Sequence, residues 1–238
     1  MRIGIIAAME EELRTLRRLL SGTTESTTGP FLFFEGRLCG LDVVLLQCGI
    51  GKVNAAVGTA LLIERFHPDS LINTGVAGGF PPDKLHIGDI VVALDVRHHD
   101  ADSTVFNYEY GQIPRMPAAY MTDTDLRETA VASVPPDFPV AVHTGQILSG
   151  DSFIHAQRQI AEIRGRFPSI MAVEMEGAAI AQTCYLFSVP FLIIRSISDL
   201  VMVEESQDMY ENFVVQAAEN SVALVLSLLT ALHKKGES

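Results

Sequence analysis

The sequence predicts a three-layer α/β/α domain around a central mixed, mostly parallel twisted sheet. Two observations favour this fold class. Short apolar runs alternate with segments of helical periodicity along nearly the whole chain of 238 residues. Several runs, such as residues 191–194, are apolar at every position, as in strands covered on both faces. Because no low-complexity or Pro/Ser-rich linker divides the chain, we expect one domain spanning residues 1–238.

The first half of the chain begins with a short apolar run at residues 2–8, which predicts a strand. Residues 10–20 carry leucines at the spacing of one helical face. Glycines at residues 75–79 indicate a tight turn or a place where the backbone approaches a ligand closely. The other elements expected here are strands at residues 31–35, 42–47 and 70–73 and a helix from about residue 52 to 66.

The second half contains a long segment without clear periodicity at residues 97–121. Segments of this length are usually functional or disordered, and its aromatic residues indicate a lid or a subunit contact. A helix is expected to begin just after the acids near residue 174. The other elements expected here are strands at residues 89–94, 140–148 and 191–194 and helices at about 124–133 and 206–233.

Composition excludes several classes of protein. The net charge of −12 would repel a phosphate backbone, so nucleic acid is not an expected partner. No apolar run approaches the ~20 residues of a membrane span, and the acids at residues 10–12 follow the first apolar run too closely for a signal peptide. Three cysteines without a CxxC pair indicate neither a disulfide framework nor structural zinc. We therefore expect a soluble, cytoplasmic protein without a membrane partner.

Two segments resemble cofactor or metal motifs without meeting their requirements. In the loop at residues 48–54, Lys52 is followed by Val53 rather than Ser or Thr, and Asn54 stands where a third glycine would be needed. Nucleoside triphosphate and dinucleotide binding are therefore not expected. The His/Asp cluster at residues 98–102 could ligate a metal, but adjacent residues seldom converge on one ion. We expect neither a metal nor a cofactor.

Charged residues gather between residues 171 and 199, where a buried core would normally exclude them. Glu176 lies near a predicted strand–helix junction, and Arg195 and Asp199 follow a buried strand. Ligands usually bind at the carboxyl ends of strands in open α/β sheets, so these residues are candidates for a common site. An internal salt bridge of Arg195 with a carboxylate, and Asp199 as a helix cap, would explain the same pattern. The acids at residues 10–12 similarly suit the first turn of any helix.

Seven motifs then coincide in order: AAMEEE, GIGKVNAA, NTGVAGG, IGDIVVALDVRHHDAD with FNYEYGQIP, SGDSF, VEMEGAAIA and RSISD. Together they resemble the 5′-methylthioadenosine/S-adenosylhomocysteine nucleosidases of the nucleoside phosphorylase superfamily. The resemblance implies irreversible hydrolysis of the N-glycosidic bond of 5′-thio-substituted adenosines, and of 5′-deoxyadenosine as a further candidate. It assigns Asp199, assisted by Ser198, as the acid that protonates adenine N7, which requires burial to raise its pKa.

The resemblance also assigns the remaining catalytic groups. Glu12 matches the general base that activates water, Arg195 helps to position the water, and Glu176 binds the ribose hydroxyls. Further substrate contacts are implied for Met9, Ile50, Val76, Ala77, Gly78, Phe153, Ile154, Glu174, Met175 and Tyr210, with Phe153 stacking on adenine and the backbone of Ile154 reading its edge. The family is homodimeric, and residues of one subunit close the 5′ pocket of the other. Those residues match Phe106, Tyr108 and Pro114.

Two departures from the family pattern bear on substrate choice. Val76 stands where many relatives have Ser, and Tyr210 stands where a Phe is common, which adds a polar tip to the 5′ pocket. These residues leave open a nucleosidase for aminodeoxyfutalosine. A purine nucleoside phosphorylase is a second alternative, although Glu12 would repel phosphate and the glycine segment offers no Arg or Ser. A non-catalytic nucleoside-binding protein is a third, but binding alone does not need both an acid and a base.

Overall fold

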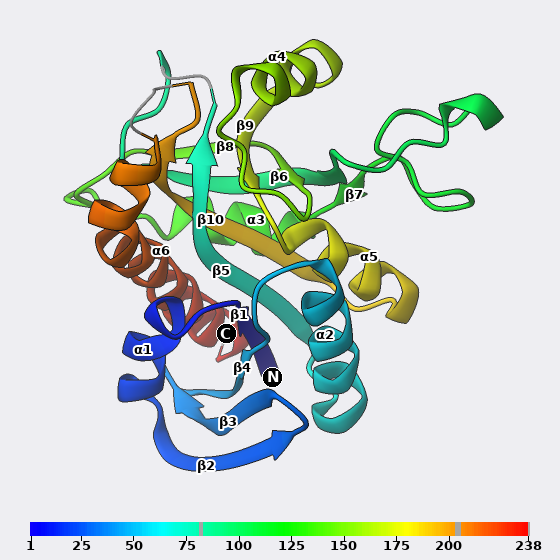
Figure 1. The fold of residues 1–238 in the computed structure, drawn as a ribbon. Coiled ribbons are helices and arrows are strands. Elements are labelled where there is room, and N and C mark those ends of the chain that lie inside the picture. Colours follow the sequence, from blue (N-terminus) through cyan, green and yellow to red (C-terminus); the bar gives the residue numbers. More distant parts are fainter. Residues whose placement is uncertain (81–82, 203–205, 238) are drawn as a thin grey trace.

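A computed structural model describes residues 1–80, 83–202 and 206–237, and its elements are drawn in Figure 1. Its strands are β1 Arg2–Ala7, β2 Ser21–Thr28, β3 Phe31–Leu38, β4 Leu41–Gln47, β5 Ser70–Gly79, β6 Ile90–His98, β7 Tyr120–Met121, β8 Val142–Ser149, β9 Ile170–Glu174 and β10 Phe191–Leu200. Its helices are α1 Glu10–Leu19, α2 Lys52–Phe66, the 3-10 helix η1 Thr104–Phe106, α3 Thr124–Ala132, α4 Gln157–Arg166, α5 Gly177–Phe187 and α6 Ser206–Gly236.

All described strands belong to one mixed sheet in the order β10-β6-β8-β9-β5-β1-β4-β3-β2, with β7 beside β6. An additional pairing of β10 with β5 closes β10, β6, β8, β9 and β5 into a ring of five strands. Strand β1 pairs in parallel with both β4 and β5, whereas β10 pairs antiparallel with β6 and β5 pairs antiparallel with β9. The predicted α/β class with a mixed sheet is confirmed.

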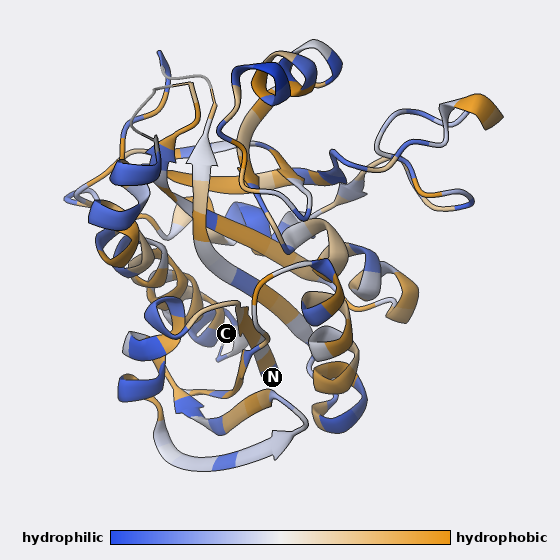
Figure 2. Cartoon of the chain, in the orientation of Figure 1, coloured by the Kyte–Doolittle hydropathy of each residue, from blue (hydrophilic) through white to orange (hydrophobic). Residues whose placement is uncertain are grey.

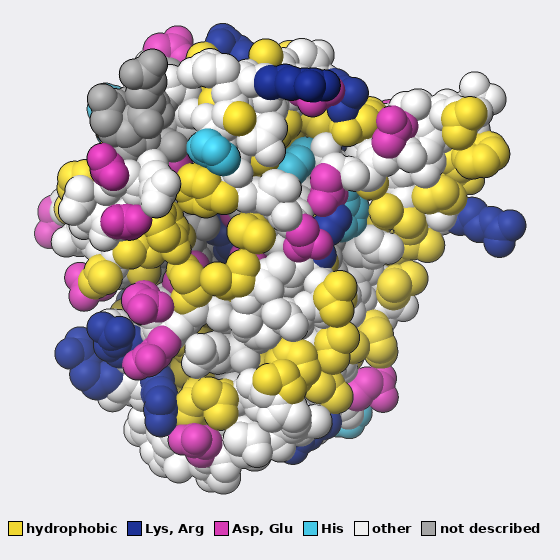
Figure 3. Space-filling model, in the orientation of Figure 1, with side chains coloured by type: hydrophobic (Ala, Val, Ile, Leu, Met, Phe, Trp, Pro, Cys, Tyr) yellow, Lys and Arg dark blue, Asp and Glu magenta, His cyan; other side chains and the backbone are white. Residues whose placement is uncertain are grey.

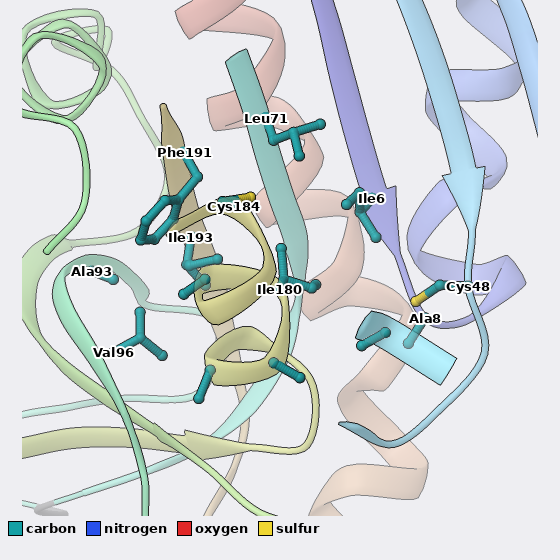
Figure 4. Close-up of a cluster of buried hydrophobic side chains, with 14 of the residues drawn as sticks. Ile6, Ala8, Cys48, Leu71, Ala93, Val96, Ile180, Cys184, Phe191 and Ile193 are labelled. Atoms are coloured by element: carbon teal, nitrogen blue, oxygen red, sulfur yellow. The ribbon is translucent and has the colours of Figure 1, made fainter. Parts of the chain in front are cut away.

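Helices cover both faces of the sheet and make the outer layers. Helices α1, α3 and α6 pack together on one face, and α2 and α5 pack on the other (Figure 1). The start of α5 is rich in small residues, which allows this helix to lie close to the sheet. Figure 4 shows Ile180 and Cys184 of α5 among Leu71, Phe191 and Ile193 of the neighbouring strands.

Helix α6 is long and apolar enough, by length and composition, to cross a membrane, and it is the one such helix among the described residues. Half of its most apolar window is buried within the domain. Val222, Leu224, Val225, Leu228 and Leu229 pack against strand residues such as Ile72 and Ile194. Core packing therefore explains its hydropathy.

Several sequence expectations need correction. The segment with glycines at 75–79 is not a turn, because β5 continues through Gly79 with ladder partners on β10. Strand β10 likewise continues through Leu200, so Arg195 and Asp199 lie within a strand and Asp199 caps no helix. Strand β2 and helix α4 were not expected.

The segment between β6 and β7 extends away from the body of the domain, as Figure 1 shows. Its end carries η1, where the side chains of Val105 and Phe106 are 83% and 73% exposed. Figure 2 shows that this end is hydrophobic. We call residues 99–119 the arm.

Candidate active site

A cavity of about 210 Å³ opens where the first turn of α1, the ends of β5 and β10, the β9–α5 junction and the start of α6 meet. Thirteen of the residues expected at the substrate line it: Met9, Glu12, Ile50, Val76, Ala77, Gly78, Phe153, Glu174, Met175, Glu176, Ser198, Asp199 and Tyr210. Ala8 and Val173 complete its wall. The structure therefore brings together residues that lie up to about 200 positions apart in the sequence.

Glu12 is the buried member of the acidic first turn of α1, with 4% of its surface exposed. Its Oε2 accepts hydrogen bonds from the backbone N–H groups of Ala8 and Met9, both at 3.0 Å, and its Oε1 accepts one from Val76 at 3.0 Å. Burial raises the pKa of Glu12, while the charge of Arg195 and these N–H groups oppose the rise. Glu12 is thus a rigidly held carboxyl group whose proton affinity is increased.

Arg195 is almost completely buried and is not among the residues that line the cavity. Its Nη2 donates to Glu174 Oε2 at 2.6 Å and to Asn73 Oδ1 at 2.5 Å, and both charged side chains are almost completely buried. Glu174 also accepts hydrogen bonds from the N–H groups of Glu176 and Gly177 and from the Ser149 hydroxyl. The internal salt bridge considered from the sequence is therefore present, and Glu174 is its acidic partner.

Glu176, at the N-terminal end of α5, has a carboxyl group that accepts fewer protein hydrogen bonds than that of Glu174. Its Oε1 accepts a hydrogen bond from the Gly51 N–H at 2.8 Å. Burial and the neighbouring Glu174 raise the pKa of Glu176 to about 8, although Arg195 and the Gly51 N–H oppose this rise. Its other oxygen accepts no hydrogen bond from the described residues, so it is available to a ligand in the cavity.

Asp199 lies near the end of β10 with 2% of its surface exposed. The Ser198 hydroxyl donates to its Oδ1 at 2.8 Å. Burial raises the pKa of Asp199 to about 6, and the hydrogen bond from Ser198 opposes that rise. Asp199 can therefore hold a proton nearer to neutral pH than an exposed aspartate does.

Aromatic and sulfur groups form the apolar part of the wall. The rings of Phe153 and Tyr210 meet edge to face with centroids 5.8 Å apart. The Tyr210 hydroxyl donates to Met9 Sδ at 3.4 Å. Ile154 lies outside this cavity, beside Phe153 in a small adjoining one of about 40 Å³ that Gly78 and Asp199 also line. Phe153 and the acids therefore line the same cavity.

The three residues expected to serve a neighbouring subunit lie on the arm. Phe106, Tyr108 and Pro114 line none of the cavity formed by the described residues of one chain. Their position on the arm keeps them away from the cavity of their own chain.

Sequence reasoning missed three residues that hold the acids in place: Asn73, Gly75 and Ser149. Asn73 and Ser149 bind the Arg195–Glu174 pair. A Cβ atom at Gly75 would lie 2.5 Å from Glu12 Oε1. Polar residues within otherwise apolar strands were the available signal for Asn73 and Ser149.

The described residues contain no group of three or more His, Cys, Asp or Glu side chains arranged to hold a metal ion. His98 instead shares a hydrogen bond with Gln182 at 3.0 Å, and burial lowers the pKa of both His98 and His99.

The chain matches the family model described as "Phosphorylase superfamily" over residues 2–230. It is 56% identical over 232 residues to a 5′-methylthioadenosine/S-adenosylhomocysteine nucleosidase of Maridesulfovibrio salexigens, covering 98% of this chain and 100% of the relative. The solved nucleosidase of Colwellia psychrerythraea in complex with adenine has a TM-score of 0.94 and 45% identity, with 98% and 96% of the two chains covered. The nucleosidase of Neisseria meningitidis, solved with methylthio-immucillin-A, has a TM-score of 0.93 and 42% identity, with 97% and 99% covered.

A futalosine hydrolase of Helicobacter pylori has the same fold with a TM-score of 0.89, 30% identity and coverage of 96% and 97%. The three relatives named above have higher identities and are nucleosidases, which confirms the resemblance seen in the seven motifs. The chain belongs to the 5′-methylthioadenosine/S-adenosylhomocysteine nucleosidases of the phosphorylase superfamily.

Proposed function

We propose that the protein hydrolyses the N-glycosidic bond of 5′-methylthioadenosine and S-adenosylhomocysteine, with 5′-deoxyadenosine as a further candidate, and releases adenine and the sugar. One observation carries the proposal: besides Glu174, which pairs with Arg195, a single cavity holds three further buried carboxyl groups, Glu12, Glu176 and Asp199, beside an aromatic wall. Such a site offers an acid, a base and a stabilising charge to one small ligand. Family membership supplies the substrate class.

Asp199 serves as the acid for the departing base. Adenine leaves poorly as an anion, so protonation at N7 lowers the barrier. The raised pKa of Asp199 supports this role because it keeps a proton on the carboxyl group near pH 6. Phe153 stacks on the adenine ring, and the backbone of Ile154 reads its edge.

Glu12 serves as the base for the attacking water. Three backbone N–H groups occupy its oxygens along defined directions, which fixes the carboxylate toward the cavity. As the glycosidic bond breaks, the ribose gains positive charge, and the carboxylates of Glu12 and Glu176 stabilise it. The charge of Arg195 opposes the rise in the pKa of both glutamates and so favours their ionised forms.

Glu176 binds the ribose hydroxyls through the oxygen that the protein leaves free. The Gly51 N–H fixes the other oxygen. Glu176 must be ionised to accept two hydroxyl donors, although its pKa of about 8 favours the protonated form at neutral pH. The charged hydrogen bonds to the ribose hydroxyls offset the cost of ionising it.

The enzyme works as a homodimer in which Phe106, Tyr108 and Pro114 of each arm close the partner's 5′ pocket. Exposed apolar side chains support this arrangement, because Val53 and Val57 of α2 are 73% and 45% exposed and Leu186 of α5 is 58% exposed. Figure 3 shows such side chains on the arm and on the face below it that carries α2 and α5. A light-scattering measurement that found fully active monomers would contradict this arrangement.

A nucleosidase for aminodeoxyfutalosine is the second candidate, because Tyr210 places a hydroxyl on the cavity wall and Val76 lines the same wall. Phosphorolysis has less support. No Lys or Arg is among the described residues that line the cavity, so an inorganic phosphate would lack a cationic partner there.

Chromatographic product analysis tests the reaction. The protein is incubated with methylthioadenosine, S-adenosylhomocysteine or aminodeoxyfutalosine, each with and without phosphate. We expect adenine from the first two without phosphate. A sugar 1-phosphate formed only with phosphate would replace hydrolysis by phosphorolysis, and no release from any substrate would favour a binding protein. A cytoplasmic location agrees with three free cysteines and is checked by cell fractionation.

A further inference from the structure

Three charged residues outside the cavity form a compact cluster where three separate segments of the chain meet. Lys52 Nζ lies 2.7 Å from Asp100 Oδ1. The other oxygen of Asp100 accepts a hydrogen bond from the Asp151 N–H at 3.1 Å. Asp151 Oδ1 in turn accepts the Lys52 N–H at 2.8 Å. The cluster therefore closes a circuit between the N-terminus of α2, the root of the arm and the turn after β8.

This circuit is directly continuous with Glu176. Gly51 precedes Lys52, adopts a left-handed conformation with φ of 96°, and donates its N–H to Glu176 Oε1 at 2.8 Å. A Cβ atom at Gly51 would meet Asp151 Oδ1 at 3.1 Å, so Asp151 also packs against Gly51. Contacts that hold Lys52 and Asp151 in place therefore also fix the Gly51 N–H group, which orients Glu176.

The side chain of Asp100 is the one member of the cluster that bonds both of the others through separate oxygens. The two side chains of its ion pair with Lys52 are 23% and 29% exposed, so water screens the pair only in part. Burial would raise the pKa of Asp100, but the Lys52 ammonium and the Asp151 N–H outweigh it and lower the pKa below the usual range. Asp100 is thus ionised throughout the neutral range.

We propose that Asp100 is a positioning residue of the hydrolase, which acts through Lys52, Asp151 and the Gly51 N–H to hold the Glu176 carboxylate toward the ribose hydroxyls. The inference rests on the proposed function, because it takes Glu176 as the ribose-binding group. It adds that contacts at the root of the arm help to set the geometry of the ribose site.

Asp100→Asn tests the inference, because it keeps the shape of the side chain while removing its charge. An amide has one acceptor oxygen, so it cannot serve both Lys52 Nζ and the Asp151 N–H. The informative measurement is the ratio of kcat/KM for methylthioadenosine to kcat/KM for its 2′,3′-dideoxy analogue. A misplaced Glu176 should lower this ratio roughly 10- to 100-fold, the loss expected for one charged hydrogen bond.

Lys52→Met should lower the same ratio, and the double variant should lose little more than either single one, because both interrupt one circuit. Glu25→Gln is the matched control: it removes an acid whose partner Arg17 lies 3.2 Å away on the far α1–β2 surface, and it should leave the ratio unchanged. The melting temperature of each variant is measured as well. A variant that melts like the wild type is folded, so a change in its ratio reflects the position of Glu176.

A ratio that stays at the wild-type value in folded Asp100→Asn, even with reduced kcat, would overturn the inference. If the wild-type enzyme released no adenine at all, the proposed function would fail instead. A crystal structure of Asp100→Asn tests the positioning role even if the enzyme is inactive. A distance from Gly51 N to Glu176 Oε1 beyond hydrogen-bonding range would support the role, and an unchanged distance of 2.8 Å would exclude it.

Discussion

The Glu12 carboxylate and the Val76 backbone are joined by a hydrogen bond of 3.0 Å that ties the first turn of α1 to the end of β5. The opposite oxygen of Glu12 is held by the N–H groups of its own helix start. The proposed base is therefore fixed by main-chain groups, which side-chain substitutions around the cavity would leave in place.

Glu12→Gln should lower kcat by about 100- to 10,000-fold, because the amide cannot take a proton from water. The amide also presents N–H groups toward backbone donors on one side, so the free energy of unfolding should fall by about 1–3 kcal/mol. Calorimetry should still detect substrate binding. A variant with undiminished kcat would return Glu12 to a purely structural role at the helix start.

Gly75→Ala should lower kcat strongly, because the new Cβ atom would lie 2.5 Å from Glu12 Oε1 and displace the carboxylate. Steady-state kinetics measure the effect, and a crystal structure should show Glu12 moved away from Val76. Gly165→Ala is the matched control, since a Cβ atom on that residue of α4 meets no atom within 4 Å. Equal kinetics for the two variants would contradict the prediction.

Asp199→Asn should abolish turnover with the fold retained. In the wild type, kcat/KM should fall as pH rises through about 6, the pKa of Asp199, because the proton needed at N7 is lost. The stability contributed by Asp199 changes with pH in the same direction as kcat/KM: it falls as pH rises. The folded pKa lies above the ordinary 3.8, so the stabilising contribution is complete below about 4 and is lost as pH rises to about 6.

Asparagine does not titrate, so the melting temperature of Asp199→Asn relative to the wild type should increase between pH 4 and pH 8. Calorimetric scans across this range measure the difference. A constant difference would show that Asp199 has an ordinary pKa and would remove the support for its role as the acid.

Arg195→Met should lower the free energy of unfolding by about 3–5 kcal/mol, because it leaves the buried Glu174 without its cationic partner. The double variant Arg195→Met/Glu174→Gln should recover part of that loss. Urea denaturation provides the values. Glu25→Gln, which removes an exposed partner of Arg17, should change stability by less than ~1 kcal/mol. Comparable losses in both single variants would mean that the buried pair contributes little.

Tyr210→Phe should change substrate preference more than rate. The substitution removes the hydroxyl that donates to Met9 Sδ on the cavity wall. Relative kcat/KM for aminodeoxyfutalosine over methylthioadenosine should fall roughly two- to tenfold, the value of one neutral hydrogen bond. An unchanged ratio would show that Tyr210 does not contact the 5′ substituent.

The cavity residues were predictable through the seven motifs that resemble the nucleosidases, and Glu12, Glu176 and Asp199 do line one cavity. Which acid pairs with Arg195 was not predictable. Glu174 and Glu176 lie two residues apart, and only the change from strand β9 to helix α5 separates their environments. The two acids therefore differ through tertiary structure rather than through local sequence.

In the fold, too, the features that the sequence did not predict depend on tertiary structure. Strand β2 was missed because its sequence, SGTTESTT, is polar and mostly exposed, so it lacks the apolar alternation that marks a strand. It forms because it pairs with β3 across a short turn. The closure of β10 onto β5 was also beyond the sequence, because pairings between strands more than 100 residues apart leave no local signature.

That closure has a consequence for how the protein is made. The strand that carries Ser198 and Asp199 leaves the ribosome only after four-fifths of the chain, yet it must enter between β5 and β6, which were synthesised long before. Until then β5 exposes an unpaired backbone edge to other chains. Nascent chains that stop before residue 191 should therefore need chaperone protection and should have no activity, since the acid arrives with the strand that completes the ring.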